Sequence, residues 1–199
     1  NARIPNNMML YYKAEGMNQP AGGYTEIPSG LKMIAGNMSA TSAQPAHEGH
    51  GFTCSNMFTN PNSVQQVALI PDCNTGLLSM KVMFPRCWDG SMEFDPANPF
   101  KHVTYGSGGV GSNGGVCPST HPKVFVGLSA LFDWQTGGST AGWKLASDGN
   151  KPGGTTIHGD WFGGWNKDVL RNWNSNCINA QWNCQTSLMG ANNTGLPGI

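Results

Sequence analysis

Short runs in which apolar and polar residues alternate dominate the chain, and this pattern predicts β-strands. The clearest run covers residues 77–84, where Ser79 and Lys81 face away from an apolar side made of Leu78, Met80, Val82 and Phe84. Pro85 then ends the strand, because proline has no N–H to donate within a sheet. Similar patterns predict further strands at residues 8–12, 31–35, 67–70 and 100–105.

The longest apolar run, residues 123–134, predicts a central strand with a bend at Gly127. One face of this strand is apolar and comprises Val124, Val126, Leu128, Ala130 and Phe132. The stretch at 106–115 is rich in glycine and serine, so it predicts a loop and a candidate mobile flap.

One convincing helix is predicted near the C-terminal end, beginning close to Asn166 with Asp168 in its first turn. On an unbroken helix the Cα atoms of Cys177 and Cys184 would lie about 10.5 Å apart at 1.5 Å per residue. A disulfide tolerates about 4.4–6.8 Å. Either the helix ends near Asn179, which we favour, or these two cysteines pair elsewhere.

Many short strands with a single helix and no internal repeat predict a mostly β fold. We expect a disulfide-braced, jelly-roll-like β-sandwich with long loops and one C-terminal helix. The length of 199 residues fits a single domain at 1–190 followed by a tail at 191–199.

Cysteine usage predicts the compartment. The six cysteines contain no closely spaced pair of the kind that binds zinc, so a disulfide framework in an oxidising compartment is expected. That compartment is extracellular or periplasmic, which makes this a secreted protein. Sequence order predicts the pairs Cys54–Cys73, Cys87–Cys117 and Cys177–Cys184, among about fifteen possible connectivities.

Charge and hydropathy exclude two classes of partner, nucleic acids and a membrane that the chain would span. Only 11% of residues are charged, with eleven basic and eleven acidic side chains, which argues against a nucleic-acid partner. No run of about 18 apolar residues exists, so no membrane span is expected.

The segment 155–165 holds the most promising chemistry. His158 and Asp160 are two residues apart, so in an extended segment they share one face. Trp161 and Trp165 offer flat apolar surfaces nearby. The alternative is a polar strand end in which His158 bonds to Asp160 beside a buried aromatic cluster.

Two further histidines are candidates. His102 lies in a predicted strand, and His121 lies in a loop bounded by Pro118 and Pro122. Together with His158 they would supply a three-histidine site for a divalent metal ion, or one of them would act as a general acid or base. The alternative is that each histidine bonds to a backbone carbonyl.

Carboxylates are few, so the list of possible catalytic acids is short. After Asp160 it contains Asp89, Asp95 and Asp133. Glycoside cleavage typically uses two carboxyl groups, about 5–5.5 Å apart for retention or 6.5–9.5 Å for inversion. Asp89, which precedes Gly90, is equally consistent with a turn residue. No phosphate-binding loop, dinucleotide fingerprint or serine-hydrolase elbow is present.

Several motifs, taken in order, resemble one secreted bacterial and fungal family, catalogued as a domain of unknown function (number nineteen-ninety-six). They are LKMIAGN at 31–37, ATSAQP at 40–45, FPRCWDG at 84–90, HVTY at 102–105, CPSTHP at 117–122, and HGDWF at 158–162 followed by Trp165. The resemblance covers nearly the whole chain, which corresponds to the C-terminal two thirds of the family's domain. It implies an exported, disulfide-containing domain, sometimes joined to modules that bind cell-wall sugars, and no established activity.

The chain departs from the family pattern at four positions, namely Asn98, Pro99, Lys101 and Asn166. The shared polar set is therefore His102, His121, His158 and Asp160. Family members usually carry an upstream segment with an Asp-Pro and a His-x-His motif, so we expect a histidine-rich site to be incomplete in this chain.

We therefore expect a secreted domain that cleaves a cell-wall or extracellular polysaccharide by acid/base catalysis. The catalytic candidates are His158, Asp160, His102, His121 and Asp89. The predicted substrate-binding residues are Trp88, Tyr105, Trp161 and Trp165. The alternatives are a non-catalytic glycan-binding module, and an extracellular protein with a divalent metal ion on His102, His121 and His158.

Overall fold

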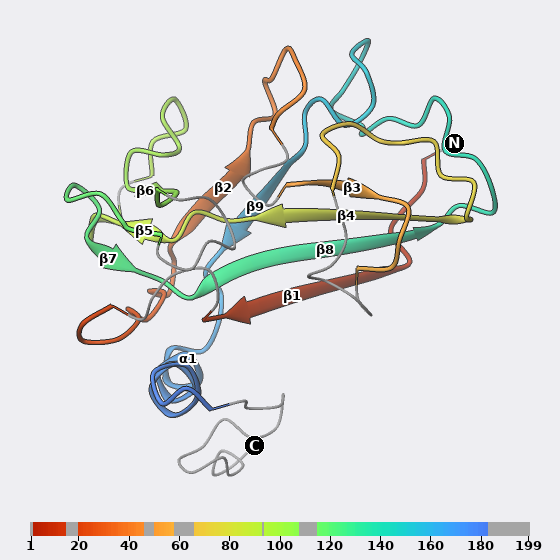
Figure 1. Cartoon of the computed structure of the whole chain (residues 1–199). Coiled ribbons are helices and arrows are strands. Elements are labelled where there is room, and N and C mark those ends of the chain that lie inside the picture. The colour runs from red at the N-terminus through yellow and green to blue at the C-terminus, as the bar shows by residue number, and fades with distance from the viewer. Residues whose placement is uncertain are drawn as a thin grey trace. The chain divides into compact units, whose positions relative to one another are not determined.

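The computed structural model describes residues 2–14, 20–45, 50–57, 66–92, 94–107 and 115–182 (Figure 1). The chain is mostly β, with antiparallel strand pairs, disulfides and one C-terminal helix, which confirms the predicted fold class. No helix within these ranges is long and apolar enough to cross a membrane. The elements are β1 (Asn7–Lys13), β2 (Lys32–Gly36), β3 (Gly51–Thr53), β4 (Leu77–Met83), β5 (Cys87–Trp88), β6 (Val103–Thr104), β7 (Lys123–Val124), β8 (Gly127–Gln135), β9 (His158–Phe162), α1 (Lys167–Trp173) and the π-helix η2 (Asn174–Ile178).

The chain forms two compact units, each assembled from three separate stretches of sequence. The first unit comprises Asn1–Tyr11, Ile34–Phe84 and Leu128–Gly159. The second unit comprises Tyr12–Met33, Pro85–Gly127 and Asp160–Ile199. The single domain predicted at 1–190 stays a prediction, and the tail predicted at 191–199 lies outside the described residues.

A four-stranded sheet in the order β1-β8-β4-β3 is the framework of the first unit. β4 and β8 pair antiparallel along their length, from Leu77 opposite Gln135 to Met83 opposite Ser129. The predicted strand at 77–84 is confirmed, but Ser79 on its polar side is not exposed to solvent. Its hydroxyl is hydrogen-bonded to the Asp133 carboxyl group on β8.

Three strand predictions need correction. Of the strand predicted at 100–105 only β6 forms, so His102 lies in a bend just before it. At 67–70 only an isolated bridge forms, between Val67 and Phe52, and the following residues bend. The predicted strand at 123–134 is two strands, β7 and β8, which separate just before the predicted bend at Gly127. Between them the Phe125 N–H donates to the Arg86 carbonyl at 2.7 Å, a bond that ties this stretch to the second unit.

In the second unit, β5 is the central strand of a three-stranded sheet in the order β6-β5-β7. Cys87 lies opposite Thr104 on one side and Val124 on the other. The predicted disulfide Cys87–Cys117 is confirmed, and so is Cys54–Cys73 in the first unit. Each disulfide stabilises the fold mainly because it restricts the unfolded chain.

The C-terminal helix begins where the sequence predicts. Asn166 is the N-cap of α1, and its side-chain oxygen accepts from the Asp168 N–H at 2.9 Å and the Val169 N–H at 3.3 Å. The helix continues as η2 and ends with Asn179 as its C-cap, which confirms the predicted end. Cys177 is disulfide-bonded, while its predicted partner Cys184 lies outside the described residues.

β2 and β9 form a two-stranded sheet, so the predicted strand at 31–35 and the extended conformation at 158–160 are confirmed. In the first unit, Asn37 donates its N–H to the Ile157 carbonyl at 3.3 Å. Gly36 has φ +71°, and a Cβ atom there would lie 2.2 Å from the Ile157 carbonyl oxygen. Glycine is therefore required at this position.

Candidate functional site

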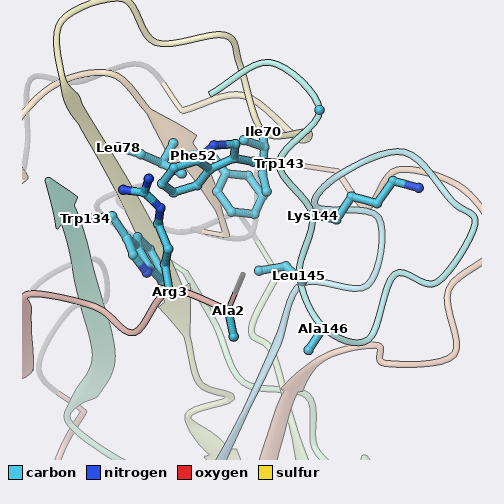
Figure 2. Close-up of a pocket in the computed structure, with 11 residues that line it drawn as sticks. Ala2, Arg3, Phe52, Ile70, Leu78, Trp134, Trp143, Lys144, Leu145 and Ala146 are labelled. Carbon is cyan, nitrogen blue, oxygen red and sulfur yellow. The ribbon is translucent and has the colours of Figure 1, made fainter. Parts of the chain in front are cut away.

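The first unit contains a cavity of about 430 Å³ whose lining is mainly apolar and aromatic. Figure 2 shows the side chains of Arg3, Phe52, Trp134 and Trp143 around this space, whereas the Lys144 side chain extends away from it. The other described lining residues are Ala2, Ile70, Leu78, Gly142, Leu145 and Ala146. None of the described lining residues carries a carboxylate or an imidazole.

The sheet supplies one side of this cavity. Leu78 on β4 lies directly opposite Trp134 on β8, and Phe52 comes from the neighbouring strand β3. Because alternate residues of a strand share a face, these positions project from a rigid, hydrogen-bonded surface. The aromatic ring of Trp134 is therefore positioned by the sheet itself.

The segment 142–146 supplies another side, and the buried Asp148 holds it. One carboxylate oxygen of Asp148 accepts from the N–H groups of Leu145 and Gly154, both at 2.7 Å. The other oxygen accepts from the N–H of Thr156 at 2.9 Å and from its hydroxyl at 2.7 Å. Asp148 thus ties the loop that carries Trp143 to the segment leading into β9.

The Asp148 carboxylate is only 1% exposed, yet it is stabilised in its ionised form. Burial by itself would raise its pKa. The hydrogen bonds from the Thr156 and Gly154 backbone, the Thr156 hydroxyl and the Leu145 backbone outweigh burial and lower the pKa below its ordinary value. An ionised carboxylate with four donors is a structural anchor, with no lone pairs left for a substrate.

Arg3 is the charged group that faces the aromatic side chains of the cavity. Its guanidinium carbon lies 5.1 Å from the ring centroid of Trp143, in cation–π range. Its Nη1 donates a long hydrogen bond of 3.4 Å to the Thr136 carbonyl. Within the described part of the chain, Arg3 forms no ion pair with a carboxylate.

The predicted catalytic pair belongs to both units, since His158 lies in the first and Asp160 in the second. His158 is half-buried, and its Nδ1 lies 2.8 Å from the Thr156 carbonyl oxygen. A carbonyl only accepts, so Nδ1 carries the proton and donates. Asp160 is exposed and has no hydrogen-bond or ion-pair partner in the described ranges. Their joint catalytic role stays a prediction.

The other two predicted histidines bond to backbone carbonyls. His102 is 1% exposed, and its Nε2 lies 2.7 Å from the Lys32 carbonyl oxygen. His121 is half-buried, with Nε2 3.1 Å from the Lys101 carbonyl and Nδ1 2.9 Å from the Thr120 hydroxyl. No group of three histidine, cysteine, aspartate or glutamate side chains suited to a metal ion occurs among the described residues. The three-histidine metal site includes residues of both units and stays a prediction.

In the second unit Asp89 is half-buried and Trp88 is buried. The Asp89 carboxylate accepts from the Ser91 N–H at 2.7 Å, which is the turn geometry that the sequence allowed as an alternative. Trp88 is 8% exposed and stacks on Phe125 with ring centroids 5.3 Å apart. Lys123 Nζ lies 4.7 Å from the Trp88 ring centroid. Little of the Trp88 ring is left for a ligand.

The remaining predicted sugar-binding aromatics differ in exposure. Trp161 is 5% exposed, and Tyr105 is half-buried with its ring 6.0 Å from that of Phe100. Trp165 is 47% exposed and lies edge-on to Tyr12 at 6.1 Å. Burial raises the pKa of Tyr12, an effect that the nearby indoles of Trp161 and Trp165 partly offset. Trp165 is the predicted residue with the most surface for a ligand.

The cavity residues Arg3, Trp134 and Trp143 were not among the predicted site residues. Trp134 ends the long apolar run, so its pattern is that of a core residue. Trp143 offers a recognisable signal, because it follows Gly142 and precedes Lys144 in a polar loop where no strand or helix is predicted. An aromatic residue in such a loop has no core to fill and is a candidate for binding.

The protein is therefore mostly β, contains disulfides and has an aromatic cavity in its first unit. The chain belongs to the family described as domain of unknown function (DUF1996), whose model matches residues 1–165. The resemblance therefore covers most of the chain, and residues 166–199, which include α1, lie outside it. No curated protein and no solved structure matches the chain.

Proposed function

We propose that this protein is a secreted glycan-binding protein and that the cavity of the first unit binds the sugar. The observation that carries the proposal is the pairing of Trp134 and Trp143 around about 430 Å³ of space. Binding pockets for small ligands typically measure about 300–1,000 Å³ and combine aromatic walls with a few polar groups. Tryptophan rings suit the apolar faces of sugar rings, and Arg3 supplies hydrogen-bond donors.

The disulfides of the described residues support an extracellular or periplasmic location. The disulfides Cys54–Cys73 and Cys87–Cys117 require an oxidising compartment for their formation. Glycans are abundant in that compartment, so a sugar-binding cavity there has a plausible ligand.

The test is binding of the wild-type chain and its variants to a panel of cell-wall and extracellular oligosaccharides, measured by calorimetry. We expect Trp143→Ala to weaken binding roughly tenfold or more, because an aromatic contact at the centre of a site contributes most of its energy. Trp143→Phe should retain part of the affinity. Trp182→Ala, which removes an exposed tryptophan of the second unit that is not a predicted binding residue, is the matched control and should bind normally. Wild-type affinity in Trp143→Ala, or no glycan binding by the wild type, would overturn the proposal.

Cleavage of a glycan at β9, outside the cavity lining, is the second candidate function. It is favoured by His158, whose Nδ1 is engaged with the Thr156 carbonyl and whose Nε2 has no hydrogen-bond partner among the described residues. A neutral imidazole in this tautomer presents Nε2 as a proton acceptor. New reducing ends released by the wild type and lost in His158→Ala and Asp160→Asn would support cleavage. Glycan retention with no new reducing ends would leave binding as the function.

A further inference from the structure

We infer that the ligand of this cavity is an acidic sugar, one that carries a carboxylate or a sulfate, and that Arg3 binds its anionic group. The inference rests on the proposed glycan-binding function and specifies its substrate class. It depends on the charge, the hydrogen bonding and the surroundings of Arg3.

The Arg3 guanidinium has unused hydrogen-bonding capacity. A guanidinium carries five N–H donors and stays protonated at every physiological pH. In the structure Arg3 makes one long hydrogen bond, of 3.4 Å, to the Thr136 carbonyl. Most of its donors therefore remain available to a ligand in the cavity.

The guanidinium has two defined neighbours on an otherwise exposed residue. Its carbon atom lies 5.1 Å from the Trp143 ring centroid, in cation–π range, and its Nη1 reaches the Thr136 carbonyl. Its partner Thr136 is buried, and donates its N–H to Gly76 at 2.8 Å and its hydroxyl to Gly138 at 2.6 Å. The planar fork of a guanidinium matches the two oxygens of a carboxylate or sulfate.

Two carboxylates of the first unit, those of Asp148 and Asp72, accept hydrogen bonds from other groups, and neither forms an ion pair with Arg3 in the described part of the chain. Asp148 is buried and accepts four hydrogen bonds from the loop that it anchors. Asp72 accepts from the Ser139 hydroxyl at 2.5 Å and from the Thr140 N–H at 3.0 Å. A cation without a paired carboxylate beside two tryptophans favours an anionic ligand over a neutral one.

The experiment compares oligogalacturonate with its fully methyl-esterified form, which has the same sugar backbone without charge. A sulfated galactan oligomer and its desulfated form make a second pair, so the two anionic groups are distinguished. Affinities of the full chain for all four are measured by calorimetry at low salt. We expect at least one acidic member to bind roughly tenfold tighter than its neutral counterpart, the scale of one charge-assisted bidentate contact.

Variants then assign this preference to Arg3. Arg3→Gln should bind acidic and neutral members alike, and Arg3→Lys should keep only part of the preference because an ammonium lacks the planar fork. Lys151→Gln also removes one positive charge from the first unit but not from the cavity lining, so it should retain the preference.

Two negative results have different meanings. If the wild type binds acidic and neutral members equally well, or if Arg3→Gln keeps the preference, the inference about Arg3 is wrong while glycan binding stands. If none of the four oligosaccharides nor any member of the wider panel binds, the proposed function itself fails, and the inference fails with it.

Discussion

Tryptophan side chains have opposite surroundings in the two units. In the second unit Trp88 is 8% exposed, stacked on Phe125 and approached by the Lys123 ammonium. In the first unit Trp143 is half-buried and lines a cavity, with Arg3 as its charged neighbour. The sequence around Trp88 is one of the motifs shared with the family, whereas none of those motifs contains Trp143. What fills the space beside each ring therefore decides whether a tryptophan can bind a ligand.

The segments that carry these tryptophans are also held by different chemistry. β5, which contains Trp88, is linked covalently through Cys87–Cys117. The loop that contains Trp143 is held by hydrogen bonds to the ionised Asp148. The first arrangement is sensitive to reductants and the second to acid, so the two regions can be perturbed separately.

The largest expected effect is that of Trp88→Ala on stability. Removing a buried tryptophan leaves a cavity beneath Phe125 and should lower the free energy of unfolding by about 3–5 kcal/mol. Denaturant titration followed by circular dichroism measures the change. Trp143→Ala is the control and should cost no more than about 1 kcal/mol, because that side chain already borders open space. Equal losses in the two variants would contradict the contrast between the units.

Asp148→Asn should have the next largest effect, about 3 kcal/mol. An amide oxygen cannot accept all four of the donors that converge on Asp148, and its NH₂ group would face N–H groups that also need an acceptor. The loop that carries Trp143 should loosen, so glycan affinity should fall together with stability. Asp72→Asn, which affects an exposed carboxylate, is the control and should cost about 1 kcal/mol or less.

The pH dependence of this effect has a defined sign. Since the pKa of Asp148 is lowered in the folded state, its ionisation stabilises the fold above the ordinary aspartate pKa of about 3.9. That stabilisation is lost as the pH falls from about 4 through the lowered pKa. The difference in unfolding free energy between wild type and Asp148→Asn should therefore shrink below about pH 4. A difference that stays constant from pH 7 to pH 3 would contradict this role of Asp148.

Sequence order was enough to predict two of the three disulfides that we expected, and local chemistry was enough to predict the ends of the helix. The N-cap at Asn166 can be predicted from the residues next to it. The end of the helix can be predicted from the Cα–Cα distance that a disulfide at Cys177 tolerates. The strand at 67–70 was wrongly predicted, because a short apolar run does not show whether a partner strand extends beside it.

The cavity could not be predicted, because its residues are distant in the sequence. Arg3, Phe52, Trp134 and Trp143 come from four separate segments, and only the pairing of the strands and the anchoring of one loop bring them together. The candidates on β9 were recognisable because His158 and Asp160 share a motif. The sequence alone does not show that Trp88 and Trp161 are buried.

Asp133 is another buried carboxyl group of the first unit. It shows whether burial in an ionised form is peculiar to Asp148. The Ser79 hydroxyl contacts both the Asp133 carboxylate and the Ser55 carbonyl, but it has one hydrogen to donate. A protonated Asp133 would donate to the Ser79 oxygen and leave that hydrogen for Ser55. In agreement, burial raises the pKa of Asp133, which outweighs the lowering by Ser79.

Asp133→Asn should therefore change stability by no more than about 1 kcal/mol below about pH 4, where the wild-type carboxyl group is protonated, because an amide can donate to Ser79 as a protonated acid does. Because the folded-state pKa of Asp133 is raised, wild-type stability falls as the pH rises from about 3.9 through that pKa. The variant should gain relative to wild type over this range, opposite in sign to Asp148→Asn. A loss comparable to that of Asp148→Asn would show that both carboxylates act as ionised anchors.

The smallest expected effect is at Gln181, which follows the helix of the second unit and has φ +56°. The Gln181 N–H donates to the Ile178 carbonyl at 3.1 Å, and the Trp182 N–H donates to the Cys177 carbonyl at 2.8 Å, the pattern of a helix end that favours glycine. Gln181→Gly should raise the free energy of unfolding by about 0.5–1 kcal/mol, because glycine adopts this conformation without steric cost. Gln181→Ala is the control: it removes the side chain and keeps the strain, so it should not stabilise. If both variants are stabilised, the glutamine side chain itself is the source of the destabilisation. If Gln181→Gly lowers the free energy of unfolding, the side-chain contact of Gln181 outweighs the backbone strain.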